Sequence, residues 1–322
     1  ANTTGEQNVA LGHNSLYSNT SGFGQVAGGY KSLFENTTGN YNTGMGAYCL
    51  ENNVSGSFNV AMGYEALQDN KTSFNTAIGY QAAKQTTTGA YNVAIGHQVL
   101  ENNTAGDENI AIGYQAMRAN TTGQRNVAIG MNTLRSNTTG EFNVGLGYDV
   151  LYNSTNASFN TALGYQALFA NTTGLRNVAV GYQALYTNTT GSNNVAVGTS
   201  ALFSNVTGQR NVAIGLSALQ GNTSGQANIA VGMETLNSNT TGQRNVSIGF
   251  TTLRANVSGK DNIAIGNAAM YTNTRGQDNV AMGSYALYNN TTASYNIALG
   301  NSALNSNTTG QYNIGIGYLY QI

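Results

Sequence analysis

The sequence predicts an all-β protein, a parallel β-solenoid (β-roll) built from nineteen short coils. The chain of 322 residues repeats the unit NTTGxxNVAIGxxALxx, whose second Asn recurs at Asn92, Asn109 and Asn126, and one step, from Asn59 to Asn75, is one residue shorter. A fixed short period is typical of solenoids, in which equivalent strands of successive coils pair. No segment between glycines reaches the roughly 12 residues that a stable helix needs. We therefore expect one continuous array over residues 1–322, without a separate capping or catalytic domain.

Two glycine columns mark the turns of the predicted coil. The glycine four residues after the second Asn of the unit, here called the core Asn, is present in every copy. Such a glycine indicates a positive φ or a close approach by another backbone. The earlier glycine, as in Gly5, becomes Ala157 and Ala293 and is lost near Lys71, so that turn is less constrained. The invariant turn glycines are Gly12, Gly29, Gly46, Gly63, Gly79, Gly96, Gly113, Gly130, Gly147, Gly164, Gly181, Gly198, Gly215, Gly232, Gly249, Gly266, Gly283, Gly300 and Gly317.

Between the turns, Val-Ala-Ile alternates with period 2 and the Ala-Leu stretch is a second apolar segment, so we expect two short strands per coil. We place the larger strand residues, such as Val127 and Ile129, inside the coil together with Leu134, and the core Asn and the Ala on the opposite face. Stacked Asn side chains then form an amide ladder. The Ala column is never charged or long, which indicates that a second chain approaches it. A parallel trimer and a lone solenoid both stay open.

Composition excludes several classes of function. With 12 basic and 13 acidic residues the net charge is −1, which attracts neither nucleic acid nor an anionic membrane surface. No apolar run reaches the roughly 18 residues of a membrane span, so no membrane insertion is expected. Cys49 is the single cysteine, which excludes an internal disulfide framework. It lies in a column of small residues, and we expect a buried thiol.

Residues that could carry chemistry do not converge. His13 and His97 replace the usual Tyr of one column five coils apart, and we interpret them as surface substitutions. Acidic residues do not recur as calcium-binding repeats require. We identify no carboxylate pair on neighbouring coils, which a polysaccharide depolymerase would need. The prediction is therefore no enzyme, no metal and no cofactor. A row of basic residues before the core Asn is interpreted as a solvated rim: Arg125, Arg176, Arg210 and Arg244.

Aromatic residues recur in two columns, one immediately before the core Asn and one after the Leu. Such rows stack on sugars or on a protein surface, or they cover the corners of the coil and a seam between chains. The first column contains Tyr41, Phe58, Phe74, Tyr91, Phe142, Phe159, Tyr295 and Tyr312. The second contains Tyr17, Phe34, Tyr152, Phe169, Tyr186, Phe203, Tyr271 and Tyr288.

The first turn carries the motif Asn-x-Ser/Thr in most copies, which is an acceptor pattern for N-glycosylation. The alternative is that Asn and Thr bond to their own backbone in a tight turn. The glycosylation candidates are Asn2, Asn19, Asn36, Asn53, Asn70, Asn102, Asn120, Asn137, Asn153, Asn156, Asn171, Asn188, Asn205, Asn222, Asn239, Asn256, Asn290 and Asn307.

Several segments resemble known repeats. NVALG at Asn8, NVAIG at Asn92 and NIAIG at Asn262 resemble the core of the YadA-like head in trimeric autotransporter adhesins. The longer unit NTTGLRNVAVGYQALY, from Asn171 to Tyr186, is similar to repeats of bacterial and phage tail-fibre proteins. The resemblance implies a left-handed parallel β-roll with three chains side by side. The unit departs from the adhesin head by extra residues in the NTTG turn.

Three functions follow as expectations. The first is a structural segment of an extracellular fibre or filament, of the adhesin-head or tail-fibre-shaft type, which presents repeated attachment surfaces at a cell or virion surface. The second is a fibril coated with N-glycans on its turns. The third is ice binding by Thr columns about 4.8 Å apart, although these are interrupted at Val54, Lys71, Val206 and Arg275.

Expected partners are the chain itself, as a lateral trimer or stacked end to end, and a cell-surface glycan or protein receptor, with no nucleic acid and no membrane. The end-to-end contact is expected because the repeat continues to both ends, where Tyr320 and Gln321 are the only deviations in the last coil.

Overall fold

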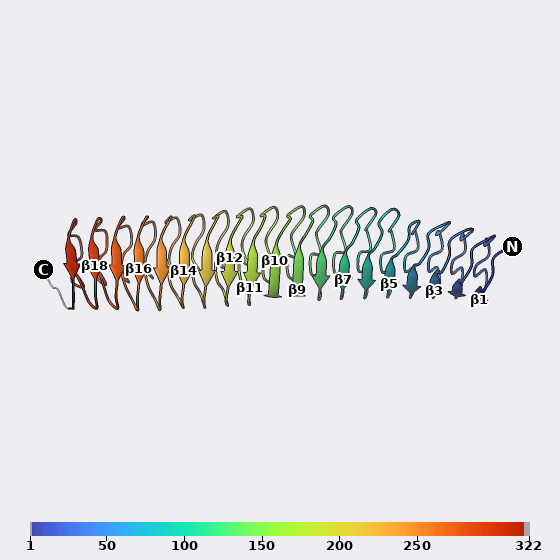
Figure 1. Ribbon diagram of the computed structural model, residues 1–322, viewed down its shortest axis with the longest axis horizontal. Helices are drawn as coiled ribbons and strands as arrows, with labels where there is room; N and C mark the ends of the chain where they lie inside the picture. Colours follow the sequence, from blue (N-terminus) through green and yellow to red (C-terminus); the bar gives the residue numbers. More distant parts are fainter. Residues whose placement is uncertain (1, 319–322) are drawn as a thin grey trace. The chain divides into compact units, whose positions relative to one another are not determined.

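The protein is an all-β parallel solenoid in the computed structural model, which describes residues 2–318 (Figure 1). Tyr320 and Gln321, on which one expectation rests, lie outside the described residues. The chain divides into two compact units, residues 1–159 and 160–322. Within each unit, every coil contributes one strand, and successive coils stack in sequence order.

Each strand is short and begins directly after the core Asn of its coil. The strands of the first unit are β1 (Val9–Leu11), β2 (Val26–Gly28), β3 (Thr43–Met45), β4 (Val60–Met62), β5 (Thr76–Ile78), β6 (Val93–Ile95), β7 (Ile110–Ile112), β8 (Val127–Ile129) and β9 (Val144–Tyr148). Those of the second are β10 (Thr161–Tyr165), β11 (Val178–Val180), β12 (Val195–Val197), β13 (Val212–Ile214), β14 (Ile229–Val231), β15 (Val246–Ile248), β16 (Ile263–Ile265), β17 (Val280–Met282), β18 (Ile297–Leu299) and β19 (Ile314–Ile316).

The strands of each unit pair in parallel with the predicted period. In β12 and β13, Val195 pairs with Val212, which is the equivalent residue of the next repeat. In β4 and β5, Val60 pairs with Thr76, so the shorter copy keeps its strand in register. Register is maintained there because the missing residue is removed from the turn before the strand, where Thr72 takes the place of a glycine and supplies its carbonyl to Asn59 Nδ2.

The predicted inner face of the strand is wrong, because the strands are turned the other way. Ala213 is fully buried, whereas its neighbour Ile214 is 40% exposed, and the same pattern recurs along both units. The core Asn, such as Asn211, is also fully buried. The large apolar residues of the interior come mainly from the Leu column, for example Leu219. The small Ala column is therefore explained by a narrow interior and gives no evidence for a second chain.

The expected second strand is also wrong. The Ala-Leu segment is a series of bends, because alternate residues adopt a left-handed backbone, as at Asn14 (φ 57°) and Leu16 (φ 51°). Such a conformation is unfavourable for non-glycine residues. It persists here because the backbone still pairs with the next coil, as in the 2.9 Å hydrogen bond from Leu16 N to Ser32 O. The bends let one short repeat close a complete coil.

The invariant glycine column satisfies both of its predicted explanations. Gly198 has a φ of +133°, a region that side chains rarely adopt. A Cβ at this position would also lie 2.6 Å from the carbonyl oxygen of Gly215 in the next coil. The earlier glycine lacks a positive φ, as at Gly191. That difference agrees with the occurrence of Ala157 and Ala293 in its column.

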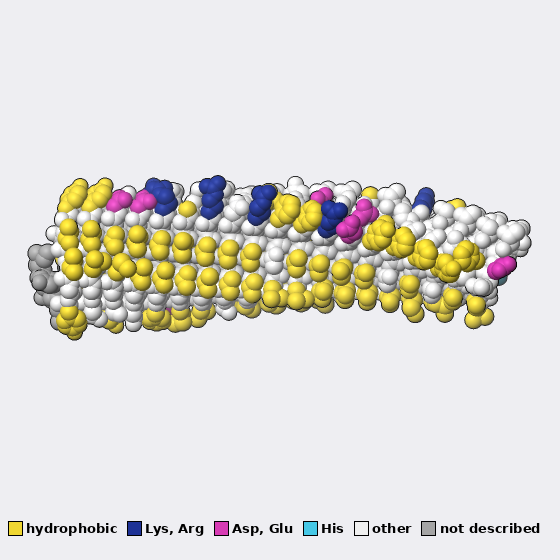
Figure 2. All heavy atoms as spheres, in the orientation of Figure 1, with side chains coloured by type: hydrophobic (Ala, Val, Ile, Leu, Met, Phe, Trp, Pro, Cys, Tyr) yellow, Lys and Arg dark blue, Asp and Glu magenta, His cyan; other side chains and the backbone are white. Residues whose placement is uncertain are grey.

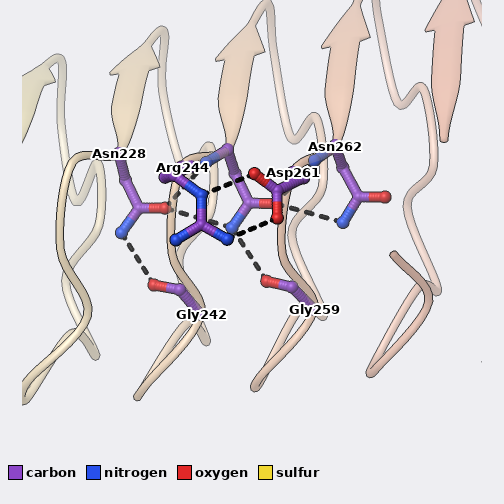
Figure 3. A network of polar contacts seen from close by, with 7 residues as sticks. Asn228, Gly242, Arg244, Gly259, Asp261 and Asn262 are labelled. Carbon is purple, nitrogen blue, oxygen red and sulfur yellow. Dashed lines mark hydrogen bonds and ion pairs between the residues drawn. The ribbon is translucent and has the colours of Figure 1, made fainter. Parts of the chain in front are cut away.

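The predicted amide ladder of core Asn residues is confirmed, and it lies inside the coil (Figure 3). Asn245 Nδ2 donates to Asn228 Oδ1 at 3.0 Å and to the Gly259 carbonyl at 2.9 Å. The backbone N–H of Asn245 donates to the same Asn228 Oδ1 at 3.1 Å. Each amide therefore uses both donors and fills its acceptor, which is what burial of a polar group requires.

A second ladder is formed by the Asn of the first turn, and we call it the turn ladder. Asn205 Nδ2 donates to Asn188 Oδ1 at 2.8 Å and to the carbonyl of Gly208 at 3.1 Å. Three buried side-chain atoms within residues 2–318 lack a hydrogen-bond partner: Thr86 Oγ1, Asn137 Oδ1 and Ser154 Oγ. All three lie in this column, because Thr86 and Ser154 stand where other coils have Asn.

Completing the turn ladder is expected to stabilise the protein. In Ser154→Asn, the new Nδ2 donates to Asn137 Oδ1 and removes an unsatisfied buried acceptor, which contributes about 1 kcal/mol. The measurement is the midpoint of chemical denaturation. Ser154→Ala is the matched control, because it removes the buried hydroxyl but leaves Asn137 Oδ1 without a donor. A Ser154→Asn variant no more stable than Ser154→Ala would contradict the ladder.

Candidate interaction surfaces

The outer face of the strands is a flat apolar surface. In the second unit, Ile229 and Ile263 are each 40% exposed, and Ile214 and Ile248 have nearly the same exposure. None of the nineteen strands in the described part of the chain contains a charged residue. Figure 2 shows rows of hydrophobic side chains running across the coils of each unit. Single exposed apolar residues are ordinary on a protein surface, whereas a continuous row of them is a candidate contact site.

The aromatic columns form stacked rows in which one ring covers the next. Phe58 and Phe74 have ring centroids 5.3 Å apart and an interplanar angle of 2°, and Phe74 and Tyr91 follow at 5.0 Å and 3°. The column after the Leu behaves in the same way, as at Tyr186 and Phe203. Because neighbours cover the ring faces, a sugar has access to a face only where a row is interrupted.

The two histidines belong to such a row. His13 stacks on Tyr30 at 5.7 Å, and His97 lies between Tyr80 at 5.0 Å and Tyr114 at 5.1 Å. Both imidazoles are exposed. They replace one stacked ring by another, which agrees with their interpretation as surface substitutions.

Most predicted glycosylation candidates lie inside the protein, in the turn ladder. Their amide nitrogens already donate hydrogen bonds, such as that from Asn222 to Asn205 Oδ1 at 2.7 Å. A glycan on Nδ2 would replace one of these hydrogens and would have to pass through the coil wall. The fully buried candidates are Asn19, Asn36, Asn53, Asn70, Asn120, Asn137, Asn171, Asn188, Asn205, Asn222, Asn239, Asn256 and Asn290. The accessible or partly accessible ones are Asn2, Asn102, Asn153, Asn156 and Asn307.

The Thr column that follows the turn Asn is bonded to the backbone. Thr223 Oγ1 donates to the Thr240 carbonyl at 3.1 Å, and Thr240 Oγ1 donates to the Val257 carbonyl at 3.1 Å. Each hydroxyl has thus given its single proton to the next coil. A regular array of free hydroxyl donors, which an ice-binding face would present, is not formed by this column.

Charged side chains pair between coils at the surface. Arg244 Nε and Nη2 donate to the two carboxylate oxygens of Asp261 at 2.6 and 2.7 Å (Figure 3). The hydrogen bond from Arg244 holds the pKa of the Asp261 carboxyl below its ordinary value. Arg125 pairs with Glu108 through one hydrogen bond, from Nε to Oε2 at 3.0 Å. Exposed pairs of this kind contribute little to stability. They agree with a solvated rim and show no convergence on a ligand.

The expectation that no carboxylate pair lies on neighbouring coils is wrong. Asp261 and Asp278 occupy the same column in successive coils, so a carboxylate pair on neighbouring coils does exist. The pair could have been predicted from the sequence, because the two residues are one full repeat apart. Asp261 is engaged by Arg244, which keeps it ionised and unsuited to act as a general acid. Within residues 2–318, no cluster of three or more His, Cys, Asp or Glu could hold a metal ion.

The expectation for Cys49 is confirmed. The thiol is fully buried, and Sγ donates to the carbonyl of Gly63 at 2.7 Å. Burial raises the pKa of the Cys49 thiol to about 11. A thiol in this environment remains protonated at neutral pH and is a poor nucleophile.

No protein-family model matches this sequence, and no curated protein is significantly similar to it. No helix in the described part of the chain is long and apolar enough to cross a membrane.

The buried thiol is expected to react slowly in the folded protein. A rise of the Cys49 pKa from 9.0 to about 11 lowers the thiolate fraction about 100-fold at pH 8. Iodoacetamide labelling at that pH, followed by mass spectrometry, should therefore be at least that much slower in the native protein than in denaturant. Equal labelling rates in the two states would contradict the burial of Cys49.

Any N-glycan on the folded protein is expected only at the five accessible candidates. Peptide mapping of material from the native source, after enzymatic deglycosylation in heavy-oxygen water, identifies each modified Asn. Unmodified protein has a mass of 33.6 kDa, which gives the reference for an intact-mass measurement. Folded protein with a glycan at Asn205 or any other fully buried candidate would show that the turn ladder is not formed as described.

Proposed function

We propose that this chain is a structural segment of an extracellular fibre, in which copies associate side by side through the outer strand face. The observation that supports it is the apolar character of that face. Its two outward columns are Val, Ile, Leu, Met, Thr or Gly in every copy and never charged. A face exposed to water would have acquired Lys or Glu in some of nineteen copies. The absence of charge therefore favours a partner surface.

The geometry of the face suits a long contact. The ten strands of the second unit, about 4.8 Å apart, extend the face over about 45 Å. Monomeric proteins seldom expose an apolar patch larger than a few hundred Å². Association of parallel chains in register would place Val and Ile of one chain against those of the next. In a parallel trimer, each chain would cover part of the face of both others.

Side-by-side association also accounts for the use of small and polar interior residues. The coil interior contains Ala, Asn and one large Leu per repeat, as in Ala213, Asn211 and Leu219. Much of the large apolar surface of each coil is therefore left on the outside. Burial of that surface between chains would add hydrophobic stabilisation that the interior of one chain does not provide. A stiff fibre would then present the remaining columns repeatedly, so that weak attachments add through multivalency.

Charges on the strand face are expected to prevent the association without unfolding the coil. In the double variant Ile229→Lys and Ile263→Lys, two ammonium groups lie on the face, and burying them unpaired is unfavourable. Sedimentation velocity should show a trimer, three times the chain mass, for the parent protein and a monomer for the variant.

The control is Tyr182→Lys, which alters a side chain that is 50% exposed but follows the invariant glycine, off the three-residue strand β11. It should associate like the parent. Thermal unfolding of the double variant should show an intact fold, since the changed side chains point outward. A parent chain that sediments as a monomer of 33.6 kDa would overturn the proposal.

A further inference from the structure

The repeat departs from its pattern most strongly in the coil of β2. Gly24 stands in the column before the core Asn, where the next four coils hold Tyr or Phe, Gln25 replaces the core Asn, and Gly28 replaces a large outward apolar residue. Gln25 still serves the core ladder, since its backbone N–H donates to Asn8 Oδ1 at 2.9 Å and its Oε1 accepts from Asn42 N at 3.1 Å. Gly24, by contrast, has no side chain that could stack on Tyr41 of the next coil.

The aromatic row before the core Asn begins at Tyr41, because the two preceding coils have Gln7 and Gly24 in this column. On one side Tyr41 stacks on Phe58, with centroids 5.2 Å apart at 24°. On the other side it leans over Gly24, where an added Cβ would lie 2.7 Å from Tyr41 Cδ1. Phe23 meets Tyr41 edge to face at 4.8 Å and 77°. At this end of the row, one face of Tyr41 has no stacked ring from the preceding coil.

A hollow of about 370 Å³ opens at this point. It is lined by Thr4, Glu6, Gln7, Ser21, Phe23 and Tyr41. Within residues 2–318, the side chains of Glu6 and Gln7 make no hydrogen bond or ion pair. One wall is therefore aromatic, and the other offers a carboxylate acceptor, an amide that both donates and accepts, and two hydroxyls.

We propose that this hollow binds one neutral pyranose ring of a saccharide. A pyranose has an apolar C–H face that packs on aromatic rings and a rim of hydroxyls that both donate and accept hydrogen bonds. The combination of aromatic walls with a few polar groups is how proteins hold small polar ligands. Glu6 is the only charged residue of the lining and repels anions, so an acidic sugar is disfavoured.

The proposal deepens the attachment role proposed above and rests on it, because it names the class of receptor and one place where the receptor binds. A second hollow of about 420 Å³ provides a comparison within the same unit. Glu35, Asn52, Val54, Asp69, Lys71, Gln85, Thr87 and Thr104 line that hollow. It has no aromatic wall, and it is not expected to hold a pyranose.

The test is saturation-transfer difference NMR on the full chain. The probes are the methyl glycosides of glucose, galactose, mannose and N-acetylglucosamine at up to about 10 mM, which detects millimolar dissociation constants. At least one neutral glycoside is expected to receive saturation, and N-acetylneuraminic acid is expected to receive much less. Absence of transfer to all four neutral probes would overturn the proposal.

Three variants locate the binding. Tyr41→Ala should weaken it about tenfold or more. Gly24→Tyr should do the same, because its Cβ, 2.7 Å from Tyr41 Cδ1, displaces the Tyr41 ring and its own ring fills the hollow. The backbone fits, because Gly24 has a φ of 66° and Phe74 of the same column adopts 66°. Asp69→Ala, in the second hollow, should bind like the parent. Thermal unfolding verifies that each variant is folded. A Gly24→Tyr variant that binds as strongly as the parent would overturn the proposal.

Sedimentation of the same samples distinguishes this proposal from the proposed fibre. If the chain binds a saccharide but sediments as a monomer, the proposed lateral association is wrong and the hollow is still supported as a binding site. If the chain associates but binds none of the neutral glycosides, the proposed fibre is still supported and the proposed saccharide site is wrong.

Discussion

Hydrogen bonding from one coil to the next is the interaction on which the rest of the structure depends. It joins the backbone groups of neighbouring coils at almost every position, including the bends, as between Leu202 N and Ala218 O at 3.0 Å. This pairing holds residues such as Leu202 (φ 52°) in a left-handed conformation that an isolated chain avoids. A coil is therefore stable only against a neighbouring coil, and the repeat is a requirement of the fold.

The same dependence governs the polar interior. An amide buried in the core ladder or the turn ladder is satisfied only when the coil beside it also supplies an amide, as Asn188 does for Asn205. A single different side chain, such as Ser154, leaves an unsatisfied atom in the adjacent coil. Buried amides penalise any other register, because a slip would separate donors from acceptors. The ladders thereby specify the stacking that the weakly apolar interior alone would leave undetermined.

Sequence alone predicted the coil length, the glycine column, the amide ladder and the buried Cys49, because each column is sampled in nineteen copies. It did not predict which face of the strand lies inside. The period-2 alternation places Ala213 and Ile214 on opposite faces of the strand but does not say which face points inward. The rule that large apolar residues lie inside gives the wrong answer here, because the interior of the coil is narrow. The sequence also did not predict that the Ala-Leu segment forms bends in place of a second strand. The bends depend on a left-handed backbone at residues such as Leu16, and Leu is not a residue type that indicates this conformation.

In such an array, regular columns and departures from them carry different information. A residue repeated in every coil, such as Gly198, or in nearly every coil, such as Asn211, satisfies a requirement of the stacking and says little about function. Outward columns need satisfy no such requirement, and the proposed lateral contact would explain their restriction to uncharged residues. A departure such as Gly24 lies where a row ends, and it leaves the last ring, Tyr41, without a stacked neighbour on one side. In the proposed fibre, attachment would derive its extent from the regular columns and its chemical selectivity from the irregular coils.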